Sequence, residues 1–77
     1  MFFTLPDGKR FKAKASKRGQ YLHAVAVQYR LPCSDGTETE FWNLASQHLS
    51  ADAAMAAGVK QVKTSPHLIN CKLLKAG

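Results

Sequence analysis

The chain has 77 residues, about half the length of an average domain, which leaves room for one hydrophobic core and excludes a second. It carries 11 lysine and arginine residues against 5 aspartate and glutamate residues, a formal charge of +6 at neutral pH. A small surface with this charge attracts polyanions, although basic residues also simply keep a small protein in solution. We therefore expect a single domain over residues 1–77 that favours anionic partners.

The sequence offers no feature that would direct it into or across a membrane. It has no apolar run near 20 residues and no apolar signal segment behind Met1. Its two cysteines, Cys33 and Cys71, are typical of a reducing compartment, and a bridge between them is the less favoured alternative. These features predict a cytoplasmic protein that does not bind membranes.

Three turns that end in glycine divide the first part of the chain into strands. The turns are Pro6-Asp7-Gly8, Arg18-Gly19 and Asp35-Gly36, and their glycines can adopt the positive φ that tight hairpins require. Between the turns, apolar and polar residues alternate, which favours extended structure. Four consecutive antiparallel strands are predicted, over residues 1–5, 10–17, 20–32 and 37–46.

A helix is predicted next, over residues 50–63. Ser50 can cap its start, Asp52 lies in the first turn, and alanine, the strongest helix former, recurs in the following turns. We expect the helix to pass through Gly58, at a cost of about 1 kcal/mol relative to alanine.

The helix is followed by one more strand. Ser65-Pro66 stops the helix, and residues 67–75 alternate well enough to form a strand. The sequence therefore predicts an α+β fold, an antiparallel sheet of four to five strands with one helix packed on one face, in the order β-β-β-β-α-β.

The hairpin loops determine which residues share a face of the sheet. If Arg18-Gly19 and Asp35-Gly36 are two-residue loops, every cross-strand pair follows, because side chains alternate between the faces. One face then collects small residues, which suit the close approach of an alanine-rich helix. This face holds Phe11, Ala13, Ala15, Leu22, Ala24, Ala26 and Ala45, with Phe41, Met55 and Ile69 filling the remaining volume.

The opposite face of the predicted sheet carries larger side chains, with Tyr29 directly across from Trp42. No predicted element covers this face, and a bare apolar patch usually means that something docks on it. The alternative is a second core layer, closed by a terminal strand or by a second copy of the chain in a homodimer. The face holds Tyr21, His23, Val25, Val27, Tyr29, Trp42 and Leu44, bordered by Arg10, Lys12 and Lys14.

Six of the eleven cations lie within residues 9–18, a stretch that contains no acid. Lysine and arginine neutralise phosphates, aromatic rings stack on exposed bases, and His23 could add a hydrogen bond or a pH-dependent charge. The predicted nucleic-acid-binding residues are Lys9, Arg10, Lys12, Lys14, Lys17, Arg18, Tyr21, His23, Tyr29 and Trp42.

Catalysis and metal binding have little support in the sequence. The five carboxylates fall in turns, at the helix start and on one strand, and no phosphate-binding glycine loop or nucleophile motif occurs. His67 and Cys71 have a spacing seen in zinc ligand pairs, but the two further candidates, Cys33 and His48, stand far apart in the chain. We expect no enzyme activity, no catalytic residue, no metal and no cofactor.

The basic hairpin, the strand after it and the helix opening at Ser50-Ala51-Asp52-Ala53 form a layout known from other proteins. Across residues 10–57 this order of elements resembles the small sheet-plus-helix domains with which phage-type integrases grip arm-site DNA. The resemblance concerns layout, and it implies DNA binding. The same compact layout is seen in small phage-encoded inhibitors of host proteins, so it favours DNA binding and protein inhibition about equally.

The sequence thus favours a non-catalytic module that binds nucleic acid, single-stranded or duplex, through a basic sheet face that bears aromatic rings. The alternative is a protein-interaction module or inhibitor, of the kind mobile elements encode, that docks its apolar sheet face on an acidic host protein. Salt separates the two hypotheses, because binding to phosphates weakens steeply as salt is added.

Overall fold

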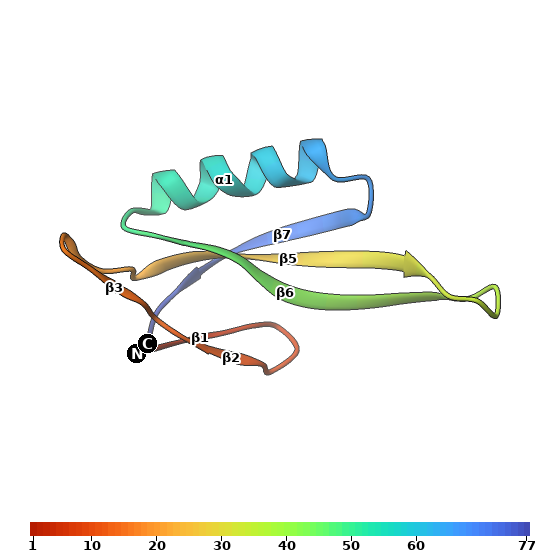
Figure 1. The fold of residues 1–77 in the computed structure, drawn as a ribbon, viewed down its shortest axis with the longest axis horizontal. Helices are drawn as coiled ribbons and strands as arrows, with labels where there is room; N and C mark the ends of the chain where they lie inside the picture. Colours follow the sequence, from red (N-terminus) through yellow and green to blue (C-terminus); the bar gives the residue numbers. More distant parts are fainter.

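The computed structural model describes residues 1–77 and confirms the α+β class, with one helix and antiparallel strands (Figure 1). Seven strands form three small sheets, ordered β1-β2, β3-β4 and β6-β5-β7. In chain order the elements are β1 (Phe2–Thr4), β2 (Arg10–Lys12), β3 (Ala15–Ser16), β4 (Gly19–Gln20), β5 (His23–Pro32), β6 (Glu38–His48), α1 (Ala51–Thr64) and β7 (Leu68–Lys75).

Local chemistry explains where α1 begins and ends. The Ser50 hydroxyl accepts a hydrogen bond from the Ala53 N–H at 3.1 Å, which satisfies a backbone donor that the first turn leaves free. Asp52 near the start and Lys63 near the end complement the helix dipole. The predicted cap and the predicted passage through Gly58 are both confirmed.

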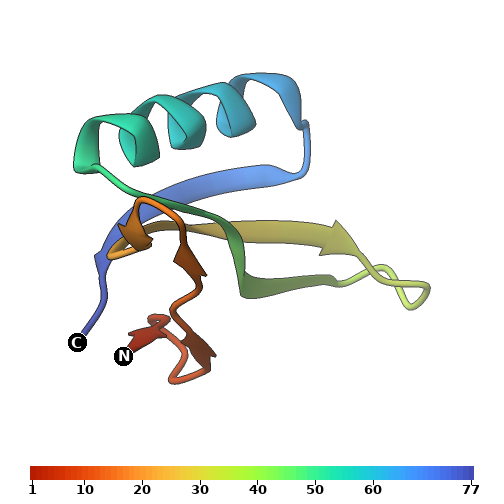
Figure 2. The same cartoon turned by 60° about the vertical axis from the view of Figure 1, so that its left-hand side comes forward.

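The helix covers the face of the central sheet that carries Val25 and Val27 (Figures 1 and 2). Gly58 permits this contact, because a Cβ at this position would lie only 3.3 Å from Cγ1 of Val25. The buried cluster under the helix consists of Val25, Val27, Ala54 and Leu68, with Tyr29 and Cys71 packed against it.

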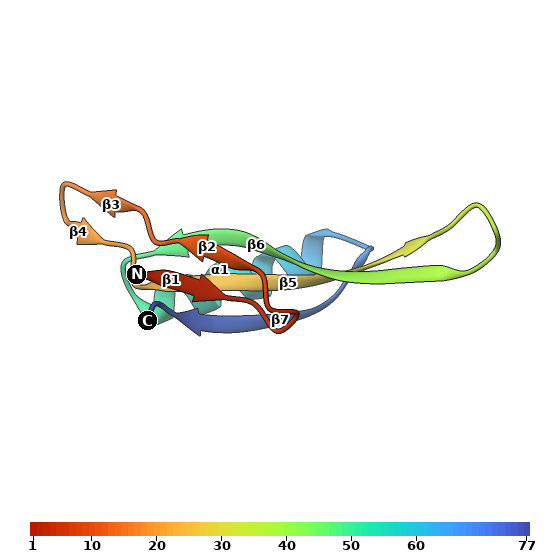
Figure 3. The same ribbon diagram turned by 90° about the horizontal axis from the view of Figure 1, so that it is seen from below.

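The prediction that α1 covers the alanine face is wrong. Ala24 belongs to a second buried cluster with Phe3 and Ala13, on the side of the sheet where the β1–β2 hairpin lies (Figure 3). Both faces of β5 are therefore covered, and residues 24–27 are all buried. The bare aromatic face expected from the sequence does not exist, because α1 covers the part of it that carries Val25, Val27 and Tyr29.

A one-residue difference in the β5–β6 loop explains the error. The loop is Ser34-Asp35-Gly36, three residues instead of two, because the Cys33 N–H bonds the Thr37 carbonyl at 2.7 Å. Gly36 has a φ of 87°, as the third position of such a loop requires. An Asp-Gly pair suits both loop lengths, so the sequence alone left the register open.

The shifted register separates the two aromatic residues that were expected to face each other. Tyr29 pairs with Phe41 and Gln28 pairs with Trp42, so Tyr29 and Trp42 lie on opposite faces of the sheet. A β-bulge opposite the Val25/Ala26 step then shifts the register again toward the end of β6.

The prediction that residues 10–17 form one long strand paired with β5 is wrong. β2 pairs with β1 instead, and β3 pairs only with β4, where Ser16 lies opposite Gly19. The turn residues are therefore Lys17-Arg18. The Ser16 hydroxyl fixes this turn, accepting from the Arg18 N–H at 3.2 Å and donating to the Gly19 carbonyl at 2.9 Å.

The two ends of the chain lie side by side (Figure 1). Phe2 and Gly77 exchange two backbone hydrogen bonds, of 3.0 and 3.1 Å, which join β1 to the residues that follow β7. The β1–β2 hairpin is thereby attached to the central sheet, with Phe3 and Leu5 fully enclosed. No helix of the structure has both the length and the apolar character needed to span a bilayer.

Candidate nucleic-acid interface

Two of the six clustered cations are engaged within the fold. The Lys9 ammonium donates to the Trp42 carbonyl at 3.1 Å and lies 3.4 Å from the Asp7 carboxylate, which links the first turn to β6. The Arg10 guanidinium lies 4.5 Å from the centre of the Phe2 ring, in a cation–π contact. Both residues contribute to the N-terminal hairpin itself.

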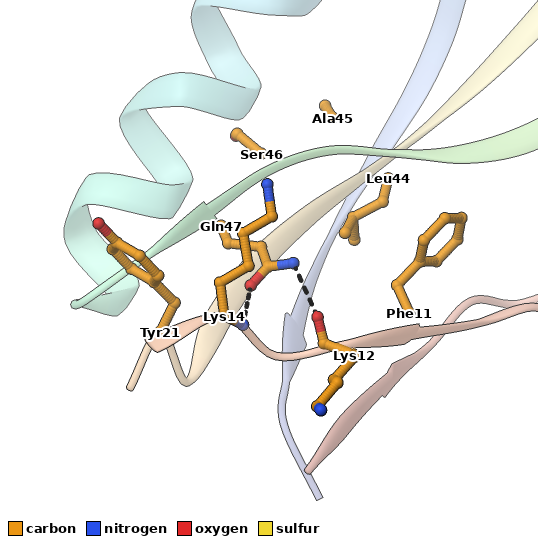
Figure 4. A pocket seen from close by; sticks show the side chains of 8 residues that line it. All are labelled: Phe11, Lys12, Lys14, Tyr21, Leu44, Ala45, Ser46 and Gln47. Carbon is orange, nitrogen blue, oxygen red and sulfur yellow. Dashed lines mark hydrogen bonds between the residues drawn. The ribbon is translucent and has the colours of Figure 1, made fainter. Parts of the chain in front are cut away.

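Lys12 and Lys14 flank Ala13, and we call these three residues the 12–14 segment. The side chain of Gln47 holds this segment against β6. The Gln47 amide accepts a hydrogen bond from the Lys14 N–H at 2.8 Å and donates one to the Lys12 carbonyl at 3.2 Å (Figure 4). Gln47 thus satisfies backbone groups that a neighbouring strand would otherwise bond. Neither lysine ammonium takes part in an ion pair, and the two side chains point to different sides of the segment.

A groove of about 480 Å³ opens between the 12–14 segment and β6. The rings of Tyr21 and Phe11 stand on either side of it in Figure 4. One wall is the bulged part of β6, where Ala45 is the extra residue, and β-bulges are common next to binding sites. The groove is lined by Phe11, Lys12, Lys14, Tyr21, Leu44, Ala45, Ser46 and Gln47.

A second hollow, of about 700 Å³, follows the same segment and is lined by Lys12, Ala13, Lys14, Ala15 and Gln20. Beyond it, Lys17 and Arg18 form the exposed tip of the β3–β4 hairpin (Figure 3). Neither makes an ion pair. Four unpaired cations therefore follow one another along residues 12–18.

Three other predicted site residues lie away from this groove. Tyr29 stacks on Phe41 with ring centres 5.1 Å apart and packs against the cluster under α1. Trp42 lies on the opposite face of the sheet, and His23, the first residue of β5, pairs with His48, the last residue of β6. Of the predicted aromatic residues, only Tyr21 lines the groove beside Lys12 and Lys14.

Three of the five acids, Asp35, Glu38 and Glu40, gather at the β5–β6 hairpin, and each has a partner there. Arg30 lies 3.4 Å from the Glu38 carboxylate and 2.9 Å from that of Glu40. The Asp35 carboxylate accepts hydrogen bonds from the hydroxyl and the backbone N–H of Thr37, which lower its pKa. None of the carboxylates lines the groove or the second hollow.

Searches of protein-family models, curated proteins and solved structures found no match to this chain. The layout also departs from the resemblance suggested by residues 10–57, because β7 joins the central sheet and the N-terminal strands pair separately.

The cysteines and histidines do not form a common site. Both cysteines are free, with Cys33 exposed and Cys71 half-buried. No three side chains among the histidines, cysteines and acids come together in a way that could hold a metal ion. The Ser46 hydroxyl and the His48 ring share a hydrogen bond of 2.7 Å, which leaves this ring partnered within β6.

The residue that sequence reasoning missed is Gln47. It lies 33 residues from Lys14 in the chain, and a glutamine on a strand carries no signal of a partner at that distance. Its role became visible only once the path of the 12–14 segment along β6 was known.

Proposed function

We propose that this chain is a non-catalytic nucleic-acid-binding module that grips the phosphate backbone with Lys12, Lys14, Lys17 and Arg18. The observation that carries the proposal is the groove beside the 12–14 segment, which combines two free lysines, two aromatic rings and a glutamine. Lysines neutralise phosphates, and rings stack on bases whatever their sequence.

Single-stranded nucleic acid suits this groove better than a duplex does. The rings of Phe11 and Tyr21 come from segments on either side of it, so unstacked bases could reach them while phosphates follow the lysines. In a duplex the bases are stacked on each other and cannot use the rings. DNA and RNA are equally compatible with these contacts.

The alternative, docking of an apolar sheet face on a host protein, is less well supported, because the apolar residues it named do not share one face. Val25 and Val27 are buried under α1. We therefore keep nucleic-acid binding as the single proposal, with the basic groove as its site.

The test measures binding of fluorescently labelled single-stranded and duplex oligonucleotides at about 50 and 200 mM salt. We expect binding that weakens steeply with salt, by about 0.7 power of salt for each phosphate contacted on a single strand. The variant Lys12→Gln/Lys14→Gln should bind at least about tenfold more weakly at the lower salt and show a shallower slope, because it loses up to two phosphate contacts.

A matched control removes the same charge from another surface. Lys60→Gln/Lys63→Gln alters two exposed lysines of α1 and lowers the net charge equally. It should keep most of the affinity if the groove is the site. Absence of oligonucleotide binding at the lower salt, or equal losses in both double variants, would refute the proposal.

A further inference from the structure

A row of exposed apolar side chains runs along one flank of α1. Met55, Val59 and Val62 are spaced by four and three residues, so they form one stripe, roughly 100° around the helix from the buried Ala54–Gly58 line. Their exposed fractions are 55%, 46% and 36%, although aliphatic side chains of this size are usually buried.

This stripe lies on the β7 side of the helix. β6 and β7 both run antiparallel to β5, so α1 crosses from one parallel strand to the other, antiparallel to both (Figures 1 and 3). The crossover is right-handed. A side chain one residue after the buried Ala54–Gly58 line is rotated by about 100° around the helix axis and therefore points toward β7. The neighbouring part of β7 exposes two more apolar residues, Ile69 and Leu73, each 40% exposed.

β7 is an edge strand whose outward backbone groups lack a strand partner, although the Cys71 N–H donates to the Asn70 side-chain oxygen at 2.9 Å. It pairs with β5 on one side, and on the other side only the residue after its end, Gly77, bonds to β1. The Ala76 N–H donates to the Leu22 carbonyl, toward β5, whereas Gly77 bonds to Phe2 on the opposite, outward side. The direction of the backbone groups alternates along a strand, so those of Leu73 and Lys75 also point outward. An apolar stripe beside an open strand edge is a surface on which another strand can pair.

We propose that this edge is a homodimer interface, in which β7 pairs antiparallel with β7 of a second copy. Pairing centred on Cys71 is self-complementary. It places Ile69 of each copy opposite Leu73 of the other. Lys72 then lies opposite Asn70, and Lys75 opposite His67, so no lysine faces a lysine.

The apolar character of the edge favours a second copy over an acidic partner. The five exposed apolar side chains form one continuous surface, and Lys60 lies on the outer side of α1. The cations that border this surface are Lys63, which follows Val59 by four residues, and Lys72 and Lys75 of β7. An acidic peptide could pair with these lysines, but it would leave the apolar side chains exposed to water. A second copy would instead bring its own Met55, Val59 and Val62 against the same stripe.

The monomer also has little core of its own. Nine hydrophobic residues are buried among 77, and neither a disulfide nor a metal cluster supplements them. Small domains without such supplements are commonly stabilised by association. The dimer would form one sheet ordered β6-β5-β7-β7-β5-β6, with both helices on one face and the basic grooves at its two outer edges.

The primary experiment uses the unaltered protein without any oligonucleotide, so its result is independent of the proposed function. Sedimentation velocity over a range of concentrations should show the mass doubling. Amide hydrogen exchange should show protection of Leu73 and Lys75 that increases with concentration, because these outward N–H groups become bonded only in the dimer. A chain that stays monomeric, or dimer-dependent protection elsewhere than β7, would overturn the proposal.

Two variants place the interface on both elements, and a third serves as a matched control. Leu73→Lys on β7 and Val59→Lys on α1 should each yield monomers that retain the circular dichroism of the folded chain. Leu49→Lys introduces the same charge at a leucine that is also 40% exposed but lies outside the stripe, and it should leave the dimer intact. A dimer that survives Val59→Lys while folded, or one lost in Leu49→Lys while folded, would contradict the assignment.

Discussion

The two ends of the molecule differ in the sign of their charge and in how that charge is used. At one end of the 46 Å long axis, the β5–β6 hairpin carries Asp35, Glu38 and Glu40 (Figure 1). At the other end, the β3–β4 hairpin carries Lys17 and Arg18. The acids at the first end have partners close by, whereas the cations at the second have none.

The difference shows why net charge alone did not locate a binding surface. Arg30 adds to the net charge of +6, but its guanidinium is engaged by Glu38 and Glu40. Lys12 and Lys14 contribute the same charge and remain free. Only the free cations can exchange their counterions for phosphates without first breaking an internal contact.

The two ends are also built differently. The acidic end consists of the long strands β5 and β6, whose cross-strand pairs support each other. The basic end consists of strands of two and three residues, attached through Phe3, Ala13 and the Gln47 amide. The position of the lysines therefore depends on a few contacts, which the following substitutions address.

The largest effect is expected for Phe3→Ala. Phe3 is fully buried between Ala13 and Ala24, and truncating a buried phenylalanine costs about 3–5 kcal/mol. In a domain of this size, each 1 kcal/mol lowers the melting temperature by about 4–8 °C. Thermal unfolding followed by circular dichroism measures the loss, and hydrogen exchange should rise in residues 1–20 before it rises in β5.

Phe2→Ala is the matched control in the adjacent position. Phe2 is 40% exposed and contacts Arg10, so its truncation should cost less than about 1 kcal/mol. Equal destabilisation by the two substitutions would mean that the basic end does not rest on Phe3. Preserved oligonucleotide binding in a Phe3→Ala protein with a loosened N-terminus would show that the lysines need no fixed position.

Local signals determined which parts of this fold could be predicted. The helix was predicted because Ser50, Asp52 and the alanines that follow act within one or two turns. The assignment of residues to the two faces of the sheet was not predicted correctly, because Asp35-Gly36 suits loops of two or three residues. A difference of one residue in the loop moves the side chains of β6 to the opposite face relative to β5. The alanine face is covered by Phe3, which contacts Ala24 although 21 positions separate them in the chain.

The same distinction applies to the candidate site. A run of lysines identified the 12–14 segment, since charge density can be read directly from the sequence. Tyr21 joined it because only a few residues separate them. Tyr29 and Trp42 were assigned through the register and were therefore lost with it. Gln47, whose bonds hold the segment, depends on tertiary structure alone.

A smaller effect is expected for Arg30→Gln, which removes the internal pairing at the acidic end. The Arg30 side chain is 47% exposed, and ion pairs of this kind contribute about 0–1 kcal/mol, so the melting temperature should fall by a few degrees at most. The fall should shrink at high salt, where such pairs are screened.

Arg18→Gln provides the opposite outcome for the same change of charge. Arg18 has no acidic partner, so stability should remain unchanged while oligonucleotide affinity decreases. Arg30→Gln should leave that affinity close to the original value. If both substitutions weaken binding equally, net charge governs binding, and the contrast between engaged and free cations has no functional meaning.

The smallest effect concerns acid and the Asp35 carboxylate at the tip of the β5–β6 hairpin. Hydrogen bonds from the Thr37 hydroxyl, at 2.6 Å, and from its backbone N–H, at 3.0 Å, lower the pKa of Asp35 below its ordinary value of 3.8. A lowered folded-state pKa means that the contribution to stability is present above the unfolded-state pKa and is lost as the pH falls through the folded-state pKa.

NMR measures this pKa directly. The carboxyl resonance of Asp35 should titrate at a lower pH in the folded protein than in an unfolded peptide. Thr37→Val should raise this pKa, and Thr37→Ser, which keeps the hydroxyl donor, should preserve it. Equal pKa values in the two variants would mean that the hydroxyl does not hold the carboxylate, and that the backbone N–H of residue 37 is the donor that lowers the pKa of Asp35.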